Sequence, residues 1–144
     1  MKKYIVVLVV AIFVAPVLLS AGEVKETVTG KNINWNKVEK AYSAGLHHQC
    51  PEVVESAIFQ VTKINLLEEN AAIQKLNREV KRLSTKGKSE VIRYQAYLAT
   101  KVIENPEWIK SNESLKNLAL YTDENRYEFF SGVAGVLNSE LLSN

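Results

Sequence analysis

The chain has 144 residues, of which 47% are hydrophobic and 24% are charged, with six Gly, three Pro and one Cys. This composition is typical of a folded domain and excludes a disordered or collagen-like chain. Lys and Arg number 18 against 16 Asp and Glu, and the counts balance without Lys2 and Lys3. Binding to nucleic acid or to an anionic membrane needs a basic excess, so neither is the expected partner. A single Cys excludes an internal disulfide and a Cys-based zinc cluster.

The N-terminal segment has the pattern of a secretory signal peptide. Two lysines precede the uncharged residues 4–19, and small residues follow up to Gly22, just before the first acid, Glu23. We expect cleavage after Ala21 or Gly22, without a lipoprotein cysteine, and hence a periplasmic or secreted protein that meets the membrane only during export. The alternative is an uncleaved anchor, which needs about 20 apolar residues. The predicted organisation is a signal peptide over 1–22, a flexible leader over 23–33 and a folded domain over 34–144.

Apolar residues recur at intervals of three and four from Asn34 onward, and no strand-length period of two occurs. This pattern predicts an all-α domain. Local capping and breaking residues set the expected boundaries. Six helices are expected. The first begins at the N-cap Asn36 and ends at Leu46, the second covers Pro51 to Asn65, and the third covers Ile73 to Leu83. The fourth follows the N-cap Ser89 and ends at Asn105-Pro106, the fifth runs from Asn112 through Ala119, and the sixth starts at Thr122 or Asp123.

The last predicted helix has one apolar stripe and two glycines. Gly132 and Gly135 lower its intrinsic helicity but permit close backbone approach. We interpret the pair as a site of tight packing, with a functional hinge as the alternative. The stripe consists of Tyr127, Phe130, Ala134, Leu137 and Leu141.

The six predicted helices form three pairs that look like copies of one another. Leu46, Leu83 and Leu120 each lie in the last turn of a first helix and are spaced 37 residues apart. In the second helices, residues 51–55 parallel residues 89–93 at an offset of 38. A period in the high thirties with two helices per unit predicts stacked helical hairpins.

The segment 46–57 resembles the turn and second helix of a HEAT repeat. In that family a leucine closes the first helix, Pro or Asp marks the turn, and a Val-Arg pair precedes an Ala. Arg93 and Ala96 fit this pattern, whereas Val54 stands where the first repeat would have Arg. The resemblance implies a right-handed stack of about three hairpins over roughly residues 36–142, an armadillo-type α-solenoid. A tetratricopeptide array and a plain helical bundle are the alternatives.

His47-His48-Gln49-Cys50 is the only sequence cluster of soft metal-ligand types. It offers three ligands, whereas a closed structural site needs four, so a solvated turn is the simpler interpretation. No Gly-x-Ser-x-Gly elbow and no phosphate-binding loop occurs in the sequence. We therefore expect no enzymatic activity and no cofactor. The alternative function is a small thiol- or metal-dependent protein that uses His47, His48 and Cys50.

Binding of another protein or peptide is the function that we expect. In a HEAT-like stack the second helices line the inner face, where their exposed charged residues would meet a partner. The mixed sign of these residues predicts a polypeptide partner and an exported, non-enzymatic interaction module or scaffold. In related repeats the residue that matches Arg93 often supports packing between repeats. A third hypothesis is self-association or an accessory subunit, in which a partner covers Phe129 and Phe130. The candidate partner-binding residues are Glu55, Lys63, Arg93, Lys101, Arg126 and Glu128.

Overall fold

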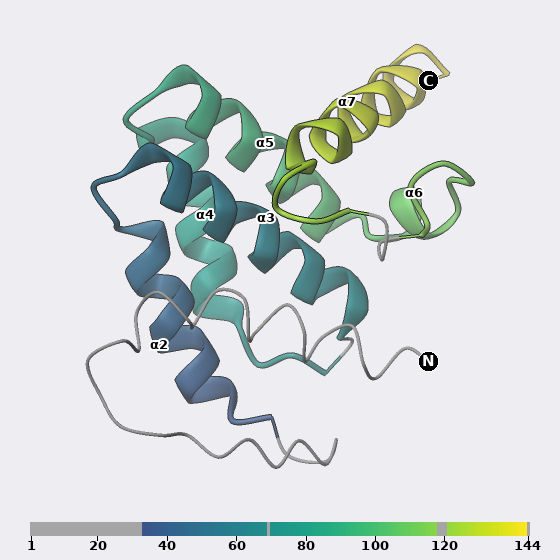
Figure 1. The fold of residues 1–144 in the computed structure, drawn as a ribbon. Coiled ribbons are helices and arrows are strands. Elements are labelled where there is room, and N and C mark those ends of the chain that lie inside the picture. The colour runs from purple at the N-terminus through teal and green to yellow at the C-terminus, as the bar shows by residue number, and fades with distance from the viewer. Residues whose placement is uncertain (1–32, 69, 118–120, 144) are drawn as a thin grey trace.

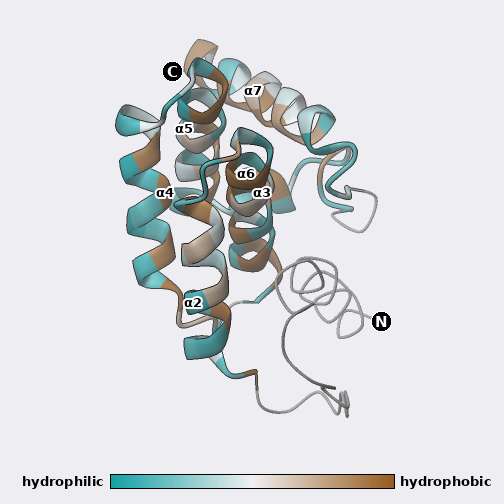
Figure 2. Cartoon of the chain, turned by 60° about the vertical axis from the view of Figure 1, so that its left-hand side comes forward, coloured by the Kyte–Doolittle hydropathy of each residue, from teal (hydrophilic) through white to brown (hydrophobic). Residues whose placement is uncertain are grey.

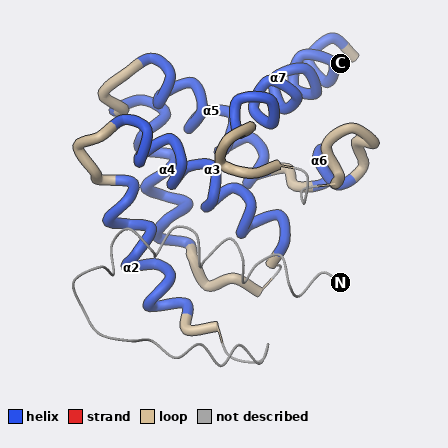
Figure 3. The backbone as a smooth tube through the Cα atoms, in the orientation of Figure 1, coloured by secondary structure: helices blue, strands red, loops and turns tan. Residues whose placement is uncertain are grey.

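The computed structural model describes residues 33–68, 70–117 and 121–143. These residues form helices without any strand, which confirms the predicted all-α class (Figures 1 and 3). The predicted signal peptide and all but the last residue of the leader lie outside the described residues. In the part of the chain described, no helix has the length and apolarity needed to cross a membrane. The helices are α2 (Trp35–Leu46), α3 (Pro51–Leu67), α4 (Gln74–Lys86), α5 (Glu90–Glu104), α6 (Glu107–Lys110) and α7 (Arg126–Leu142).

Local residues determine where three of these helices begin. The Oδ1 atom of Asn34 accepts a hydrogen bond from the backbone N–H of Lys37 at 3.2 Å, so α2 begins at Trp35. The predicted N-cap, Asn36, is wrong by two residues and lies inside the first turn. Pro51 occupies the first position of α3 as predicted. The predicted cap of α5 is also confirmed, because the Ser89 hydroxyl accepts from the backbone N–H of Ile92 at 3.1 Å.

Four helices form two hairpins that pack side by side. Helix α2 packs against α3 and α4 against α5, while α2 also contacts α4 and α3 contacts α5 (Figure 1). Helix α4 turns a hydrophilic side outward (Figure 2). The side-chain amides of Asn65 and Asn77 exchange two hydrogen bonds of 2.8 and 2.9 Å and link α3 to α4. Helix α3 therefore has neighbours on several sides, and all its residues from Val54 to Ile64 are buried.

The region after α5 differs from the predicted third hairpin. Helix α6 is a single turn, and the helix predicted from Asn112 is wrong for residues 112–117, which form turns. The Asn112 side chain accepts hydrogen bonds from the backbone N–H groups of Ser114 and Leu115, a local arrangement that competes with helix formation. Leu120, the third leucine of the repeat pattern, lies outside the described residues.

Helix α7 begins at Arg126, later than the predicted Thr122 or Asp123. The delay has a local cause, because the Asn125 side chain accepts from the backbone N–H of Thr122 at 2.6 Å and closes a turn there. The predicted apolar stripe is wrong at Tyr127 and Leu141, which are exposed. The buried positions of α7 are Phe129, Phe130, Val133 and Leu137.

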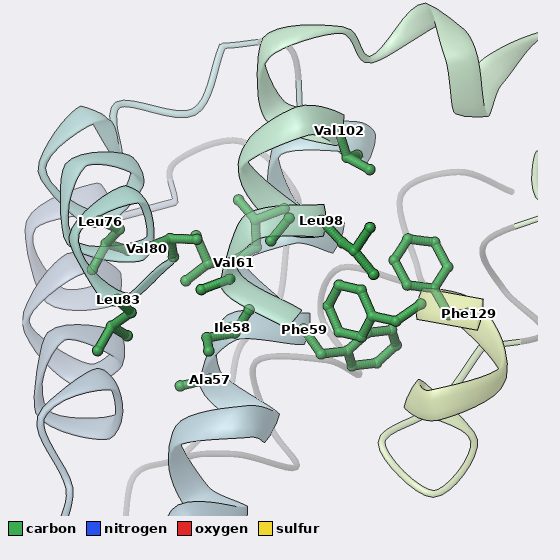
Figure 4. Close-up of a cluster of buried hydrophobic side chains, with 14 of the residues drawn as sticks. Ala57, Ile58, Phe59, Val61, Leu76, Val80, Leu83, Leu98, Val102 and Phe129 are labelled. Atoms are coloured by element: carbon green, nitrogen blue, oxygen red, sulfur yellow. The ribbon is translucent and has the colours of Figure 1, made fainter. Parts of the chain in front are cut away.

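An aromatic cluster joins α7 to α3. The ring of Phe59 meets those of Phe129 and Phe130 edge to face, with centroids 5.6 and 6.3 Å apart. Figure 4 shows Phe59 and Phe129 pointing toward one another beside Leu98 of α5. Such pairs add to the stabilisation from apolar burial. The chain itself thus covers Phe129 and Phe130, which contradicts the hypothesis that a partner must cover them.

The two glycines of α7 have different surroundings. A Cβ atom on Gly132 would lie 2.6 Å from Cδ2 of Leu115, whereas a Cβ on Gly135 would have no atom of a described residue within 4 Å apart from its own helix. The predicted tight packing is therefore confirmed at Gly132 and wrong at Gly135.

Candidate functional site

Two of the six predicted binding residues are buried in α3. Glu55 is only 5% exposed and Lys63 only 3%. The prediction that they are exposed is wrong because α3 is covered by α2, α5 and α7 rather than by one neighbour alone.

The other four predicted residues lie on α5 and at the start of α7. Arg93 is half-buried, and its Nη1 donates to the carbonyl oxygen of Gly87 at 2.9 Å, so it packs against the turn that precedes its own helix. Lys101 is half-buried with its Nζ 5.6 Å from the centre of the Tyr97 ring, within the range of a cation–π contact. Glu128 is exposed, and the Arg126 side chain is largely buried.

Glu55 is the centre of a polar cluster between α3, α5 and α7. Its Oε2 atom accepts a hydrogen bond from the Tyr127 hydroxyl and lies 3.6 Å from Nη2 of Arg126. The Gln95 side chain donates to the same oxygen at 3.5 Å. The structure thus brings together two predicted residues, Glu55 and Arg126, and adds Gln95 and Tyr127, which the sequence interpretation missed. One indication of Gln95 was available, since it interrupts an apolar face of α5.

The cluster holds Tyr127 as a neutral hydrogen-bond donor. Its hydrogen bond to Glu55, together with burial and the carboxylate charge, raises the pKa of the Tyr127 phenol above its ordinary value. The Arg126 guanidinium lies 4.8 Å from the centre of the Tyr127 ring and also contacts the Asp123 carboxylate at 3.3 Å. A buried charge pair with hydrogen bonds on both members fixes geometry. This cluster therefore orients the first turn of α7 on the two hairpins.

Lys63 makes a second link between α3 and the segment before α7. Its Nζ donates to the carbonyl oxygen of Tyr121 at 2.5 Å and lies 5.3 Å from the centre of the Phe59 ring. Burial lowers the pKa of Lys63 below its ordinary value. These contacts make Lys63 a structural residue of the inner side of α3.

Several large side chains of α5 and α7 stay exposed. Tyr94 and Tyr97 of α5 are 55% and 40% exposed, and Tyr127 of α7 is 51% exposed. Val91 is also exposed and lies one helical turn before Tyr94 and Gln95. The side chains of Gln95 and Tyr127 both hydrogen-bond to the Glu55 carboxylate, which links α5 to α7. We call these four residues, Val91, Tyr94, Tyr97 and Tyr127, the tyrosine face.

The turn between α2 and α3 holds the two histidines and the cysteine, each engaged with a different group. Nε2 of His47 lies 3.2 Å from the Glu79 carboxylate of α4. Nδ1 of His48 accepts from the backbone N–H of Cys50 at 3.1 Å. The Cys50 thiol donates to the Glu52 carboxylate at 2.9 Å, and this hydrogen bond lowers the pKa of Glu52. Among the described residues, no three His, Cys, Asp or Glu side chains gather as a metal site would require.

Comparisons of the chain with protein-family models, with curated proteins and with solved structures found no match. The geometry of the described residues is thus what supports a function.

Proposed function

We propose that this chain is an exported, non-enzymatic interaction module that binds another polypeptide through its tyrosine face. The observation that carries the proposal is the exposure of Tyr94, Tyr97 and Tyr127 on neighbouring helices. Tyrosine supplies a large contact area at a low cost in conformational entropy and is enriched where proteins bind one another.

The surroundings of the tyrosine face fit a polypeptide partner. Lys101 and Arg126 lie against tyrosine rings, and Glu128 is exposed on the first turn of α7. Charges of both signs beside exposed aromatic rings complement a polypeptide surface better than a polyanion. The buried contacts of Glu55 hold Tyr127 in place, so the face is organised before a partner arrives, which lowers the entropy lost on binding.

A HEAT-like stack is the architecture that we propose for the domain. The pairing of α2 with α3 and of α4 with α5, and the contacts of α2 with α4 and of α3 with α5, support two stacked units. The buried residues Leu46 and Leu83, which close the first helices of these units, line a common pocket. In such a stack α5 and the start of α7 would form the binding side, because α3 is buried between the other helices.

Export is part of the same proposal. The positive, apolar and small-residue order of residues 1–22 supports a cleaved signal peptide and a periplasmic or secreted location. Mass spectrometry of the protein recovered from the cell envelope and from the medium tests this. A chain that begins at Gly22 or Glu23 is expected, and recovery of the uncleaved chain alone contradicts export by this route.

Site-specific photo-crosslinking tests the binding face. The photoreactive residue p-benzoylphenylalanine would replace Tyr94, Tyr97 or Tyr127, one at a time, in the full chain in its own cells. Arg78, exposed on α4, serves as the control position. We expect one discrete protein adduct from the tyrosine positions and none from the control. The same adduct from Arg78 would contradict the proposed face.

A binding measurement with the captured protein completes the test. The double variant Tyr94→Ser/Tyr97→Ser is expected to weaken binding at least about tenfold, because exposed tyrosines at an interface centre carry much of the affinity. Its free energy of unfolding should stay within about 1 kcal/mol of the parent's, since neither side chain is buried in the core. Unchanged affinity in this variant would refute the proposal.

A further inference from the structure

A pocket of about 220 Å³ lies at one end of the two hairpins, where the α2–α3 turn meets the α4–α5 turn. Its floor is apolar and contains Leu46, Leu83 and Ile92, while basic side chains surround the opening. Among the residues that the structure describes, no Asp or Glu lines the pocket. The lining residues are Leu46, His47, His48, Gln49, Pro51, Val54, Arg82, Leu83, Lys86, Lys88 and Ile92.

The basic side chains of the pocket are only partly neutralised. The Glu79 carboxylate lies 3.0 Å from Nε of Arg82 and 3.2 Å from Nε2 of His47, and so offsets charge at one side of the opening. Lys86 and Lys88 are exposed and form no ion pair with a residue that the structure describes. The pocket therefore keeps an excess of positive charge above an apolar floor.

We propose that this turn pocket binds an acidic peptide segment in which a large apolar side chain stands beside carboxylates. The apolar floor receives the side chain, and Lys86 and Lys88 pair with the carboxylates. The volume is below the roughly 300 Å³ at which pockets for whole drug-sized ligands begin, so it suits one anchoring side chain. The absence of acids from the lining favours an anionic segment over a neutral or basic one.

Neighbouring contacts keep the pocket formed without a ligand. Gly87 packs so closely that a Cβ atom there would lie 2.7 Å from Cγ2 of Ile92, and the Arg93 side chain binds the carbonyl oxygen of Gly87. The turn that carries Lys86 and Lys88 is thus held against α5. A preformed site loses less conformational entropy on binding.

Fluorescence anisotropy with labelled peptides tests this proposal on the full exported chain. The probe is a peptide of alternating Leu and Glu, with one twin of alternating Leu and Gln and another of alternating Ser and Glu. We expect the Leu–Glu peptide to bind at least about fivefold more tightly than either twin, because only it supplies both the apolar anchor and the charge. Equal binding of the Leu–Gln peptide, or no binding of the Leu–Glu peptide, overturns the proposal.

Paired variants locate the site. Lys86→Gln/Lys88→Gln is expected to weaken binding of the Leu–Glu peptide at least about fivefold, while Lys40→Gln/Lys75→Gln, which removes the same charge from exposed positions on α2 and α4, leaves it unchanged. Equal weakening by both pairs would show a diffuse charge effect and would overturn the proposal. Binding to phosphatidylglycerol vesicles without binding of the Leu–Glu peptide would also overturn the proposal.

The proposal for the turn pocket and the proposal for the tyrosine face can be refuted separately. The variant Tyr94→Ser/Tyr97→Ser should retain the affinity of the parent for the Leu–Glu peptide, since neither tyrosine lines the pocket. A loss of peptide binding in that variant would place the peptide on the tyrosine face and overturn the assignment to the pocket.

Discussion

Lys63 shows how a charged side chain can serve the core rather than a partner. It lies on α3, buried over the Phe59 ring, and its ammonium group donates to the carbonyl oxygen of Tyr121. Burial of a cation is unfavourable unless hydrogen bonds compensate it, which is why the pKa of Lys63 falls. The ammonium group thus loses contact with water and instead makes a hydrogen bond that links α3 to the segment before α7.

The lowered pKa of Lys63 predicts a pH dependence of stability. Between that lowered value and the ordinary value of 10.5, the unfolded chain holds more protons than the folded chain. The free energy of unfolding contributed by this group therefore rises with pH across the interval. We expect the free energy of unfolding from urea denaturation to change more favourably with pH, as the pH increases toward 10.5, in the parent than in Lys63→Met.

The matched control for this prediction is an exposed lysine. Lys75→Met on α4 should keep the pH slope of the parent, because its side chain stays in water in both states. Equal slopes for the parent and Lys63→Met would show that Lys63 is solvated in the folded protein.

Tyr127 gives a second prediction at the scale of one residue. Tyr127→Phe removes the hydroxyl that donates to Glu55, and a loss of about 1 to 2 kcal/mol at neutral pH is expected, toward the low end because the ring is half-exposed. Since its pKa is raised in the folded state, this contribution is present below about pH 10 and is lost as the pH rises through the folded pKa. The difference between parent and variant should therefore shrink in alkaline solution, as measured by urea denaturation.

Tyr94 provides the comparison for Tyr127. It is equally exposed but lies on the solvent side of α5, so Tyr94→Phe should change the free energy of unfolding by less than about 0.5 kcal/mol. A loss for Tyr94→Phe as large as that for Tyr127→Phe would contradict the role given to the bond with Glu55.

At the scale of an element, α7 contains its own matched pair of substitutions. Gly135→Ala adds a methyl group where no neighbouring described residue lies within 4 Å, and it should stabilise the protein by about 0.5 to 1 kcal/mol through helix propensity. Gly132→Ala gains the same propensity but must displace the buried Leu115, and overpacking typically costs about 1 to 3 kcal/mol. Urea denaturation should therefore rank Gly135→Ala above Gly132→Ala by at least about 1 kcal/mol. Equal stabilities would mean that Leu115 does not pack on α7.

Helix starts that depend on adjacent residues were predictable from the sequence. Pro51 and Ser89 act through their own backbone or hydroxyl, and the structure has both where predicted. The start of α7 was not predictable in this way, because Asn125 closes a turn with Thr122 that the apolar periodicity does not reveal. Asn112 likewise binds the backbone ahead of it and prevents the expected helix. Short polar side chains that compete for backbone groups thus account for the errors between α5 and α7.

The candidate binding site was harder to predict than the helices. The sequence pattern predicts that Glu55 and Lys63 face solvent, because charged residues usually occupy the outer side of a helix. Their burial depends on α7 and on the segment around Tyr121, which lie more than 50 residues away in sequence. The pattern also predicts that Tyr127 is buried, because it falls on the apolar stripe of the last helix. The packing of α7 against α3 and α5 decides whether each of these side chains is buried or exposed.

At the scale of the whole molecule, the helices differ in how completely they are enclosed. Helix α3 is buried along most of its length between the other helices. Helix α7 is anchored by Phe129 and Phe130 in its first half, while Leu141 and Leu142 near its end are exposed. The domain is thus expected to open from α7 inward, with α3 the last helix to lose its structure.

Native-state hydrogen exchange checks this order. Amides of residues 54–64 should exchange only by global unfolding, with the free energy of opening equal to that of the whole domain, because every residue of this run is packed. Amides of residues 138–142 should exchange through local fraying with protection lower by at least about a hundredfold. Protection at the end of α7 equal to that of α3 would require a further contact over Leu141 and Leu142. Such a contact could come from a second copy or from a part of the chain beyond the described residues. Dilution of the protein distinguishes the two, because only a contact between copies weakens on dilution.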